Sequence, residues 1–362
     1  ETLDHVASSP AVALFVEHAM AARPSFRLDP SNVRAVAELC RRLDGLPLAI
    51  ELVAARIRLL PPEAILERLG DRIDVLDSGS VNLPDRQRTL RATLDWSYRL
   101  LEADEQALFA RLAVFAGGAS LDAIEFVCHG EPVDDVLETL SSLLEKSLVV
   151  TFHDADVGPR IAMLQTVRAY AWRHLEEAAE LVEVRDRHAT WFQELAARCD
   201  PARHPGATER WAELDREVAN VRAAIAWRTE QDDDAALGSI AASSWIWYWL
   251  TGRMSEGRVW IERLASRVRP PDRVEPAVAA SIWEALGAVR FSLGDHLEAE
   301  VLLRHALAAY GAADDAPGAA VASCMLALIV PANGDVAEAI DLATSAATSA
   351  RSRELDWGLS FA

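Results

Sequence analysis

Few side chains in this 362-residue chain are grouped in the way that catalytic or metal-binding residues usually are. The nine histidines form no His-Glu-x-x-His pattern, and no Gly-x-Ser-x-Gly segment marks a serine nucleophile. The four cysteines, Cys40, Cys128, Cys199 and Cys324, lack the short paired spacing of a zinc or redox site. We therefore predict no catalytic residue, no metal ligand and no disulfide framework.

The one lysine of the chain bears on nucleotide binding. A P-loop ends in Gly-Lys-Ser or Gly-Lys-Thr, and its lysine contacts the β and γ phosphates. Lys146 follows Glu145, so this sequence contains no P-loop. Any nucleotide that these residues help to bind must have its phosphates held elsewhere.

A turn at Gly45-Leu46-Pro47-Leu48 joins two predicted helices. Apolar residues at helical spacing lead up to it, and a nearly all-apolar helix is predicted to run from Leu48 to Leu60. Gly45 suits a left-handed helix cap, and Pro47 suits the first turn of the next helix, where its missing N–H costs nothing. On spacing alone this segment is most simply a structural turn.

Two other groups of residues could be sites but have plainer explanations. The aromatic run Trp245–Leu250 could form a ligand cage, yet neighbouring positions on a helix point in different directions, which favours a packed core. Isolated histidines such as His174 and His188 are expected on the surface or at helix caps. Neither group predicts a function.

The composition indicates a folded, multidomain protein without membrane spans. Hydrophobic residues make up 51% and charged residues 25% of the chain, and no apolar run approaches the ~20 residues that cross a bilayer. The net charge of −20 disfavours nucleic acid and anionic lipid as partners. Because the chain begins at Glu1 without a signal-like segment, we expect a fragment of a longer cytoplasmic protein.

The elements that must position these residues are predicted to be almost all helices. After helices from about residue 90 to 145, segments 147–152 and 160–163 flank a turn and predict a β-hairpin. Three helices followed by a hairpin predict a winged helix. Gly252, Gly294 and Gly334 then recur at intervals of 42 and 40 residues, which indicates a helical-hairpin array of the tetratricopeptide kind.

Five ordered segments resemble NB-ARC proteins of the STAND class of signal-transducing ATPases, above all bacterial LuxR-type transcriptional regulators. They are Ser9–Glu17 with Cys40–Leu52, Thr89–Tyr98, Leu112–Gly118, Leu144–Val149 and Met163–Ala171. The resemblance implies a mainly α fold with a helical domain, a winged helix with a small β-hairpin, and a tetratricopeptide-like α-α superhelix. The expected bounds are 1–72 for the helical lid domain, 85–180 for the winged helix, 181–234 for a helical linker and 235–362 for the repeats.

The resemblance also implies a nucleotide site. In the family, an upstream P-loop domain holds ADP or ATP, and the proline of the Gly-Leu-Pro-Leu turn packs on the adenine. This role falls on Gly45, Leu46, Pro47 and Leu48, and the present chain alone is expected to hold no nucleotide. The family's closing element often contains Met-His-Asp, whose histidine senses the β-phosphate, whereas this chain has Met163-Leu164-Gln165.

The function expected from this resemblance is regulatory and not enzymatic within this chain, although the complete protein is a candidate slow ATPase switch. The repeats are expected to receive a protein or small-molecule inducer, and nucleotide-dependent homo-oligomers are left open. Residues 134–146 carry four acids and one base, which argues against DNA contact by the helix before the wing. The alternatives are that the same relay controls a nucleotide cyclase or another enzymatic effector, or that the repeats are a plain scaffold.

Overall fold

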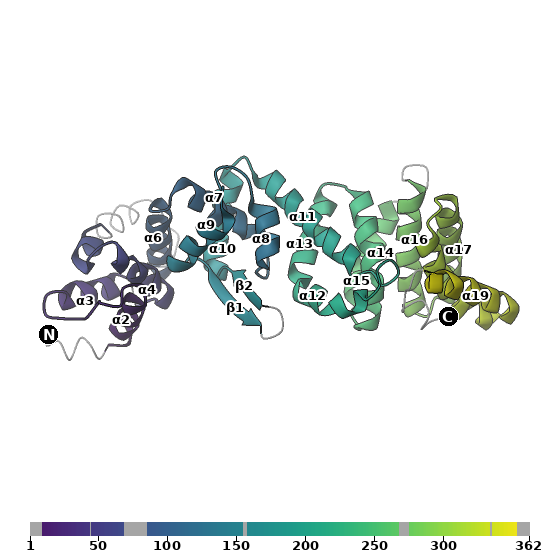
Figure 1. Cartoon of the computed structure of the whole chain (residues 1–362), viewed down its shortest axis with the longest axis horizontal. Coiled ribbons are helices and arrows are strands. Elements are labelled where there is room, and N and C mark those ends of the chain that lie inside the picture. Colours follow the sequence, from purple (N-terminus) through teal and green to yellow (C-terminus); the bar gives the residue numbers. More distant parts are fainter. Residues whose placement is uncertain are drawn as a thin grey trace. The chain divides into compact units, whose positions relative to one another are not determined.

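Helices make up most of the chain in the computed structural model, which describes residues 9–43, 45–68, 85–154, 158–267, 275–333 and 335–352 (Figure 1). The chain divides into two units, Glu1–Val184 and Arg185–Ala362. One two-stranded antiparallel sheet accompanies the helices within the described ranges. The predicted mainly α fold is therefore confirmed.

The first unit begins with a small helical cluster around one apolar core. Its elements are α2 (Pro10–Ala22), α3 (Val33–Arg42), α4 (Pro47–Ala54) and the 3₁₀ turn η1 (Ala55–Arg58), followed by helical residues 62–68. Phe15 of α2, Leu39 of α3 and Ile50 of α4 are completely buried in this core. The helix predicted from Leu48 to Leu60 tightens into η1 after Ala54, as helices often do in their last turn.

The winged-helix part of the first unit follows. Its helical elements are α6 (Asp85–Arg99), α7 (Ala103–Arg111), η2 (Leu112–Val114), α8 (Leu121–Cys128), α9 (Val136–Glu145) and α10 (Gln165–Glu177). The predicted hairpin is present as β1 (Val150–Asp154) and β2 (Gly158–Ala162), paired in the register Val150 to Ala162. A bridge between Ala119 and Ile161 ties the segment before α8 to the hairpin. The wing lies where the sequence predicted it, but four α-helices, α6 to α9, precede it and not three, because the short helix α8 was not predicted.

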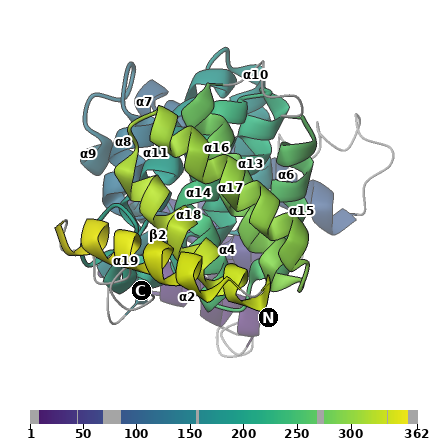
Figure 2. The same ribbon diagram turned by 90° about the vertical axis from the view of Figure 1, so that its right-hand side faces the viewer.

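The second unit begins within α11, at Arg185, and continues as successive helical hairpins. Its elements are α11 (Leu181–Arg198), η3 (Ala207–Arg210), α12 (Trp211–Arg216), α13 (Val218–Glu230), α14 (Asp234–Leu250), α15 (Met254–Arg267), α16 (Pro276–Ser292), α17 (His296–Ala312), α18 (Ala316–Ile329), η5 (Val330–Asn333) and α19 (Val336–Ser352). Each of the last helices packs on the one before it, and Figure 2 looks onto α16, α17 and α18. This is the antiparallel stacking of a repeat array.

Two of the three glycines whose spacing predicted the repeats lie in turns between successive helices. Gly252 and Gly294 take the left-handed conformation, with φ of +74° and +81°, while the third glycine, Gly334, lies outside the described residues. A side chain on Gly287 of α16 would approach Leu303 Cγ of α17 to 2.8 Å. The close approach of α16 and α17 therefore depends on this glycine.

The aromatic run is core, and one histidine prediction is wrong. Trp245, Trp247 and Tyr248 are buried in the second unit, which confirms the packing interpretation. His188 is also buried within α11, contrary to the prediction of a position on the surface or at a helix cap, and its Nε2 lies 3.4 Å from Asn220 Oδ1. The spacing of apolar residues along α11 gives no sign that another helix, α13, covers the side chain of His188. No described helix is long and apolar enough to cross a membrane.

Candidate functional site: the Gly45–Leu48 turn and the polar network behind it

The Gly45–Leu48 turn presents a proline on a rigid support. Gly45 has a φ of +64°, and its N–H donates to the carbonyl of Cys40 at 3.0 Å, which closes the end of α3. Pro47 occupies the first turn of α4 and is exposed. Leu46 packs against the apolar core of the helical cluster, and the N–H of Ile50 donates to its carbonyl at 3.0 Å. The ring of Pro47 is thus held at the surface by a backbone that cannot easily move.

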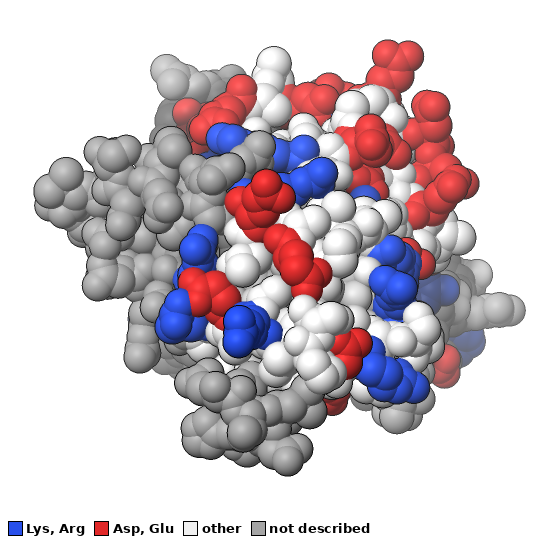
Figure 3. Space-filling view, turned by 90° about the vertical axis from the view of Figure 1, so that its left-hand side faces the viewer, with Lys and Arg blue, Asp and Glu red and all other residues white. Residues whose placement is uncertain are grey.

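The chemistry of this turn suits a flat base better than a phosphate. An exposed proline ring offers apolar surface and no hydrogen-bond donor. The nearest basic side chains in sequence, Arg41 and Arg42, both pair with Glu38. Figure 3 faces the side of the first unit that includes α2 and α3, where basic and acidic side chains are interspersed. The surface on this side is therefore not a strongly basic phosphate site.

Two arginines of η1 connect the helical cluster to the winged helix. Arg56 is only 2% exposed, and its Nη2 donates to the carbonyl of Ser97 in α6 at 3.3 Å. Burial lowers the pKa of Arg56 to about 10, against the opposing effect of the Glu105 charge. Arg58 pairs with Glu145 at the end of α9. A short 3₁₀ turn, one helix away from Pro47, thus makes polar contacts with two elements of the winged helix.

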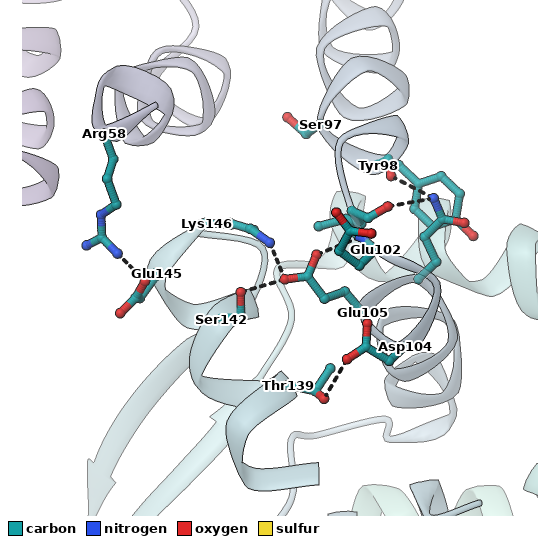
Figure 4. A network of polar contacts seen from close by, with 12 residues as sticks. Arg58, Ser97, Tyr98, Glu102, Asp104, Glu105, Thr139, Ser142, Glu145 and Lys146 are labelled. Carbon is teal, nitrogen blue, oxygen red and sulfur yellow. Dashed lines mark hydrogen bonds and ion pairs between the residues drawn. The ribbon is translucent and has the colours of Figure 1, made fainter. Parts of the chain in front are cut away.

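Glu105 of α7 connects this helix to the C-terminal end of α9, where Glu145 also lies (Figure 4). Its carboxylate accepts a hydrogen bond from Ser142 Oγ at 2.5 Å and pairs with Lys146, and it also accepts from the N–H of Glu102 at 2.8 Å. Burial raises the pKa of Glu105, but these hydrogen bonds and the Lys146 charge outweigh burial and hold it below its usual value. We call Arg56, Arg58, Glu105, Glu145 and Lys146 the polar network. It fixes α7, α9 and η1 to one another.

The segment 163–165 leads into α10, which is hydrogen-bonded to two other elements of the winged-helix part. Leu164 is the N-cap of α10, and Gln165 is its first residue. Arg168 Nε donates to the carbonyl of Ala113 at 2.8 Å, and the hydroxyl of Tyr170 donates to Asp95 Oδ1 at 2.7 Å. His174, predicted on the surface or at a helix cap, lies in the last turn of α10 and is partly exposed, with its ring stacked on that of Tyr98 at a centroid distance of 3.9 Å. α10 therefore connects α6 and η2 through side-chain hydrogen bonds to both.

The helix before the wing exposes no basic side chain. Leu137, Glu138, Ser141 and Glu145 are the exposed residues of α9. Lys146, which follows this helix, is already paired with Glu105. The outer face of α9 is thus neutral to acidic, which is unfavourable beside phosphate.

The sequence interpretation named the turn but missed the residues that connect it to the winged helix. Arg56 and Arg58 lie in a segment interpreted only as a buried helix, and Glu105 in one interpreted only by its apolar positions. A charged residue inside an apolar helical stripe was the available signal, because such a residue must find a partner when it is buried. Among the described residues, no group of three histidine, cysteine or acidic residues is placed to hold a metal ion.

Comparison with known protein families identifies two parts of the chain. Residues 101–176 match the winged helix-turn-helix domain family, and residues 278–352 match a tetratricopeptide repeat family. The chain contains a winged helix-turn-helix domain and tetratricopeptide repeats. Both matches fall where the described helices and the wing lie.

The chain is similar to longer mycobacterial proteins. A Mycobacterium tuberculosis protein, whose given name proposes an HTH-type transcriptional regulator, is 38% identical over 256 residues, which are 70% of this chain and 29% of the relative. An uncharacterised protein of the same organism is 39% identical over 185 residues, or 50% of this chain and 47% of that protein. The chain thus spans less than a third of the named regulator and about half of the other relative.

One solved structure is similar in outline. It is a signal transduction ATPase with numerous domains (STAND) from Pyrococcus horikoshii, which carries a tetratricopeptide repeat sensor. The TM-score is 0.49 at 15% sequence identity, over 94% of this chain and 47% of that one.

Proposed function

We propose that this chain is the relay and sensor part of a nucleotide-controlled transcriptional regulator of the LuxR type. A P-loop domain outside these residues holds ADP or ATP by its phosphates, and the Gly45–Leu48 turn contacts the adenine. The winged helix passes on the nucleotide state, and the repeats receive a protein or small-molecule signal. The similarity to a named HTH-type regulator and the order of the two identified domains support this proposal.

The observation that carries the proposal is the position of Pro47 relative to the polar network. Pro47 is exposed at the start of α4, and η1 follows α4 directly. Arg58 of η1 pairs with Glu145, and the buried Arg56 reaches α6. A nucleotide that presses on the turn is therefore connected through one short helix to charged contacts with the winged helix. Two alternative arrangements of these contacts are what a switch of this kind requires.

Pro47→Ala is expected to weaken ADP retention by the complete protein about fivefold. Packing one face of a base on a proline ring removes roughly 50 Å² of apolar surface, worth about 1 kcal/mol. This chain alone should show no measurable ADP affinity, because that contact cannot offset the cost of immobilising the ligand. Calorimetry with ADP on both proteins measures the two effects.

Pro61→Ala is the matched control, since Pro61 is also exposed and also precedes a helix. Circular dichroism must show that α4 survives in both variants. Tight ADP binding by this chain alone, or an unchanged affinity of the folded complete Pro47→Ala protein, would show that Pro47 is only a helix-turn residue.

This chain is also expected to bind no duplex DNA in a sequence-selective manner. The net charge of −20 repels DNA at long range, and the exposed residues of α9 include no cation that could displace condensed counterions. A gel-shift titration at low and moderate salt measures this. Selective, salt-sensitive binding that disappears when residues 133–146 are changed would assign DNA recognition to the winged helix itself.

A further inference from the structure

The second unit contains an open cavity lined by α13, α14 and α15. Both α13 and α15 pack on α14. The cavity has a volume of about 650 Å³, and its apolar lining includes Ile225 of α13, Leu237 and Tyr248 of α14, and Trp260 and Leu264 of α15. Cavities of this size are typical of sites for small molecules.

Two apolar residues at the rim of the cavity are exposed to solvent. Val259 of α15 lies at the rim and is 67% exposed, and Ala226 of α13 is exposed beside the same cavity. On α13 the lining residues recur at 222, 225, 226, 229 and 230, and on α15 at 256, 259, 260, 263 and 264. Each helix therefore turns one continuous face toward the cavity.

The charged side chains around the cavity include one arginine that has no acidic partner among the described residues. Arg222 and Glu256 form a two-pronged ion pair across the gap between α13 and α15, with both N–O distances 2.6 Å. Glu230 is paired with Arg185 at 2.8 Å. Arg263 lines the cavity and is exposed, and it has no ion pair or side-chain hydrogen bond with any residue in the described ranges. The uncompensated charge at the cavity is therefore positive.

We propose that this cavity binds a small amphipathic carboxylate, with its apolar body on Tyr248, Trp260 and Leu264 and its carboxylate on Arg263. The proposal rests on the proposed role of the repeats as the sensor, and it names the chemical class of the signal. A partner helix is a poorer occupant, because it is about 10 Å wide and the Arg222–Glu256 pair bridges the gap that it would have to enter.

Calorimetry of this chain with sodium decanoate, below its micelle concentration, tests the site. We expect one binding site per chain. Arg263→Ala should weaken decanoate about fivefold through the lost ion pair. Ala226→Trp and Val259→Trp should each weaken it by about tenfold or more, because an indole occupies space that the alkyl chain needs.

Two matched controls separate the site from general effects. Val301 holds the same position after Gly294 that Val259 holds after Gly252, is 55% exposed and does not line this cavity, so Val301→Trp should bind decanoate like the unaltered chain. Arg258→Ala, on the same helix as Arg263 but away from the cavity, should do the same. Circular dichroism confirms that each variant is folded.

Several outcomes would overturn the proposal. They are no decanoate binding by the unaltered chain, equal binding by the Val259→Trp and Val301→Trp variants, and equal weakening by Arg263→Ala and Arg258→Ala. Tighter binding of decyltrimethylammonium than of decanoate would reverse the assigned ligand charge. The sensor role is tested separately by deleting residues 235–362 from the complete protein: loss of its response with no decanoate site would leave the sensor role intact and exclude only this cavity.

Discussion

Raising the pH from about 5 to about 8 is expected to destabilise the second unit by several kcal/mol, and Glu284→Gln should remove much of that loss. Glu284 of α16 is 3% exposed, and its Oε1 accepts a hydrogen bond from Trp245 Nε1 of α14 at 2.6 Å. Burial raises the pKa of Glu284 to about 8. The carboxyl group is therefore protonated in the folded protein under conditions where the unfolded chain would ionise it.

A second buried acid acts in the same direction. Asp200, in the segment between α11 and η3, is almost fully buried, and burial raises its pKa to about 7. Arg203 lies between this carboxylate and Asp315 at the N-cap of α18, with N–O distances of 3.4 and 2.7 Å. Arg203 opposes the shift of Asp200, while Asp315 adds to it. One arginine does not neutralise the charges of two carboxylates, Asp200 and Asp315.

The sign of the pH dependence follows from these shifts. Both folded-state pKa values are raised above the usual values of 4.5 and 3.8, so their stabilising effect is complete at low pH. It is lost as the pH rises toward about 7 and 8, because unfolding then releases protons that the folded state retains. Each proton released contributes about 1.4 kcal/mol per pH unit.

Urea unfolding at about pH 5 and about pH 8, followed by tryptophan fluorescence, measures the effect. The Glu284→Gln variant keeps an oxygen for Trp245 and cannot ionise, so its stability should be about 3 kcal/mol less sensitive to pH than that of the unaltered chain. Glu275→Gln is the control, because Glu275 is exposed at the start of the same helix and its side chain makes no cap hydrogen bond. Parallel pH profiles for the unaltered chain and Glu284→Gln would show that Glu284 is ionised when folded.

These residues show what could be predicted from the sequence and what could not. The mainly helical order and the wing follow from short-range periodicity, and they are present at the predicted places apart from α8, which was not predicted. The segment 199–206 was predicted to be part of a helical linker, yet Arg203 pairs with Asp315, a residue 112 positions away. Hydrophobic periodicity carries no information on such a distant polar contact. The acid between Trp283 and Ala285 can be read from the sequence, but neither its burial nor its partner Trp245 can.

The candidate site also has parts that could be predicted from the sequence and parts that could not. The Gly45–Leu48 turn was predicted because glycine and proline have strong local preferences, and its conformation agrees with them. Whether the turn contacts a nucleotide stays a prediction. The partners of Arg56 and Arg58 could not be predicted, because they depend on how the helical cluster packs on α6 and α9. The boundary between residues 72 and 85 lies outside the described residues.

Arg111→Met is expected to lower the free energy of unfolding of the first unit by about 3–5 kcal/mol. Arg111 ends α7 and is 3% exposed. Its guanidinium donates to the carbonyls of Cys128, Gly130 and Glu131 at 2.9, 2.6 and 2.6 Å, and it holds Glu180 through two bonds of 2.7 and 3.0 Å. Methionine fills much of the same volume but leaves these carbonyls without a donor.

Arg111→Lys separates charge from geometry, because an ammonium group keeps the charge but cannot reach three carbonyls and a carboxylate in one plane. We expect Arg111→Lys to recover less than half of the lost stability. Arg99→Met, at an exposed position at the end of α6, should change the stability by no more than about 0.5 kcal/mol. Urea unfolding of the three variants measures these differences.

Arg111 fixes the loop that leads from α8 into α9, so its loss should also loosen the contact of α9 with Arg58 and Glu105. If Arg111→Met were as stable as Arg99→Met, the carbonyls around residue 130 would have to be satisfied by water, and the loop would not be what holds α9 in the polar network.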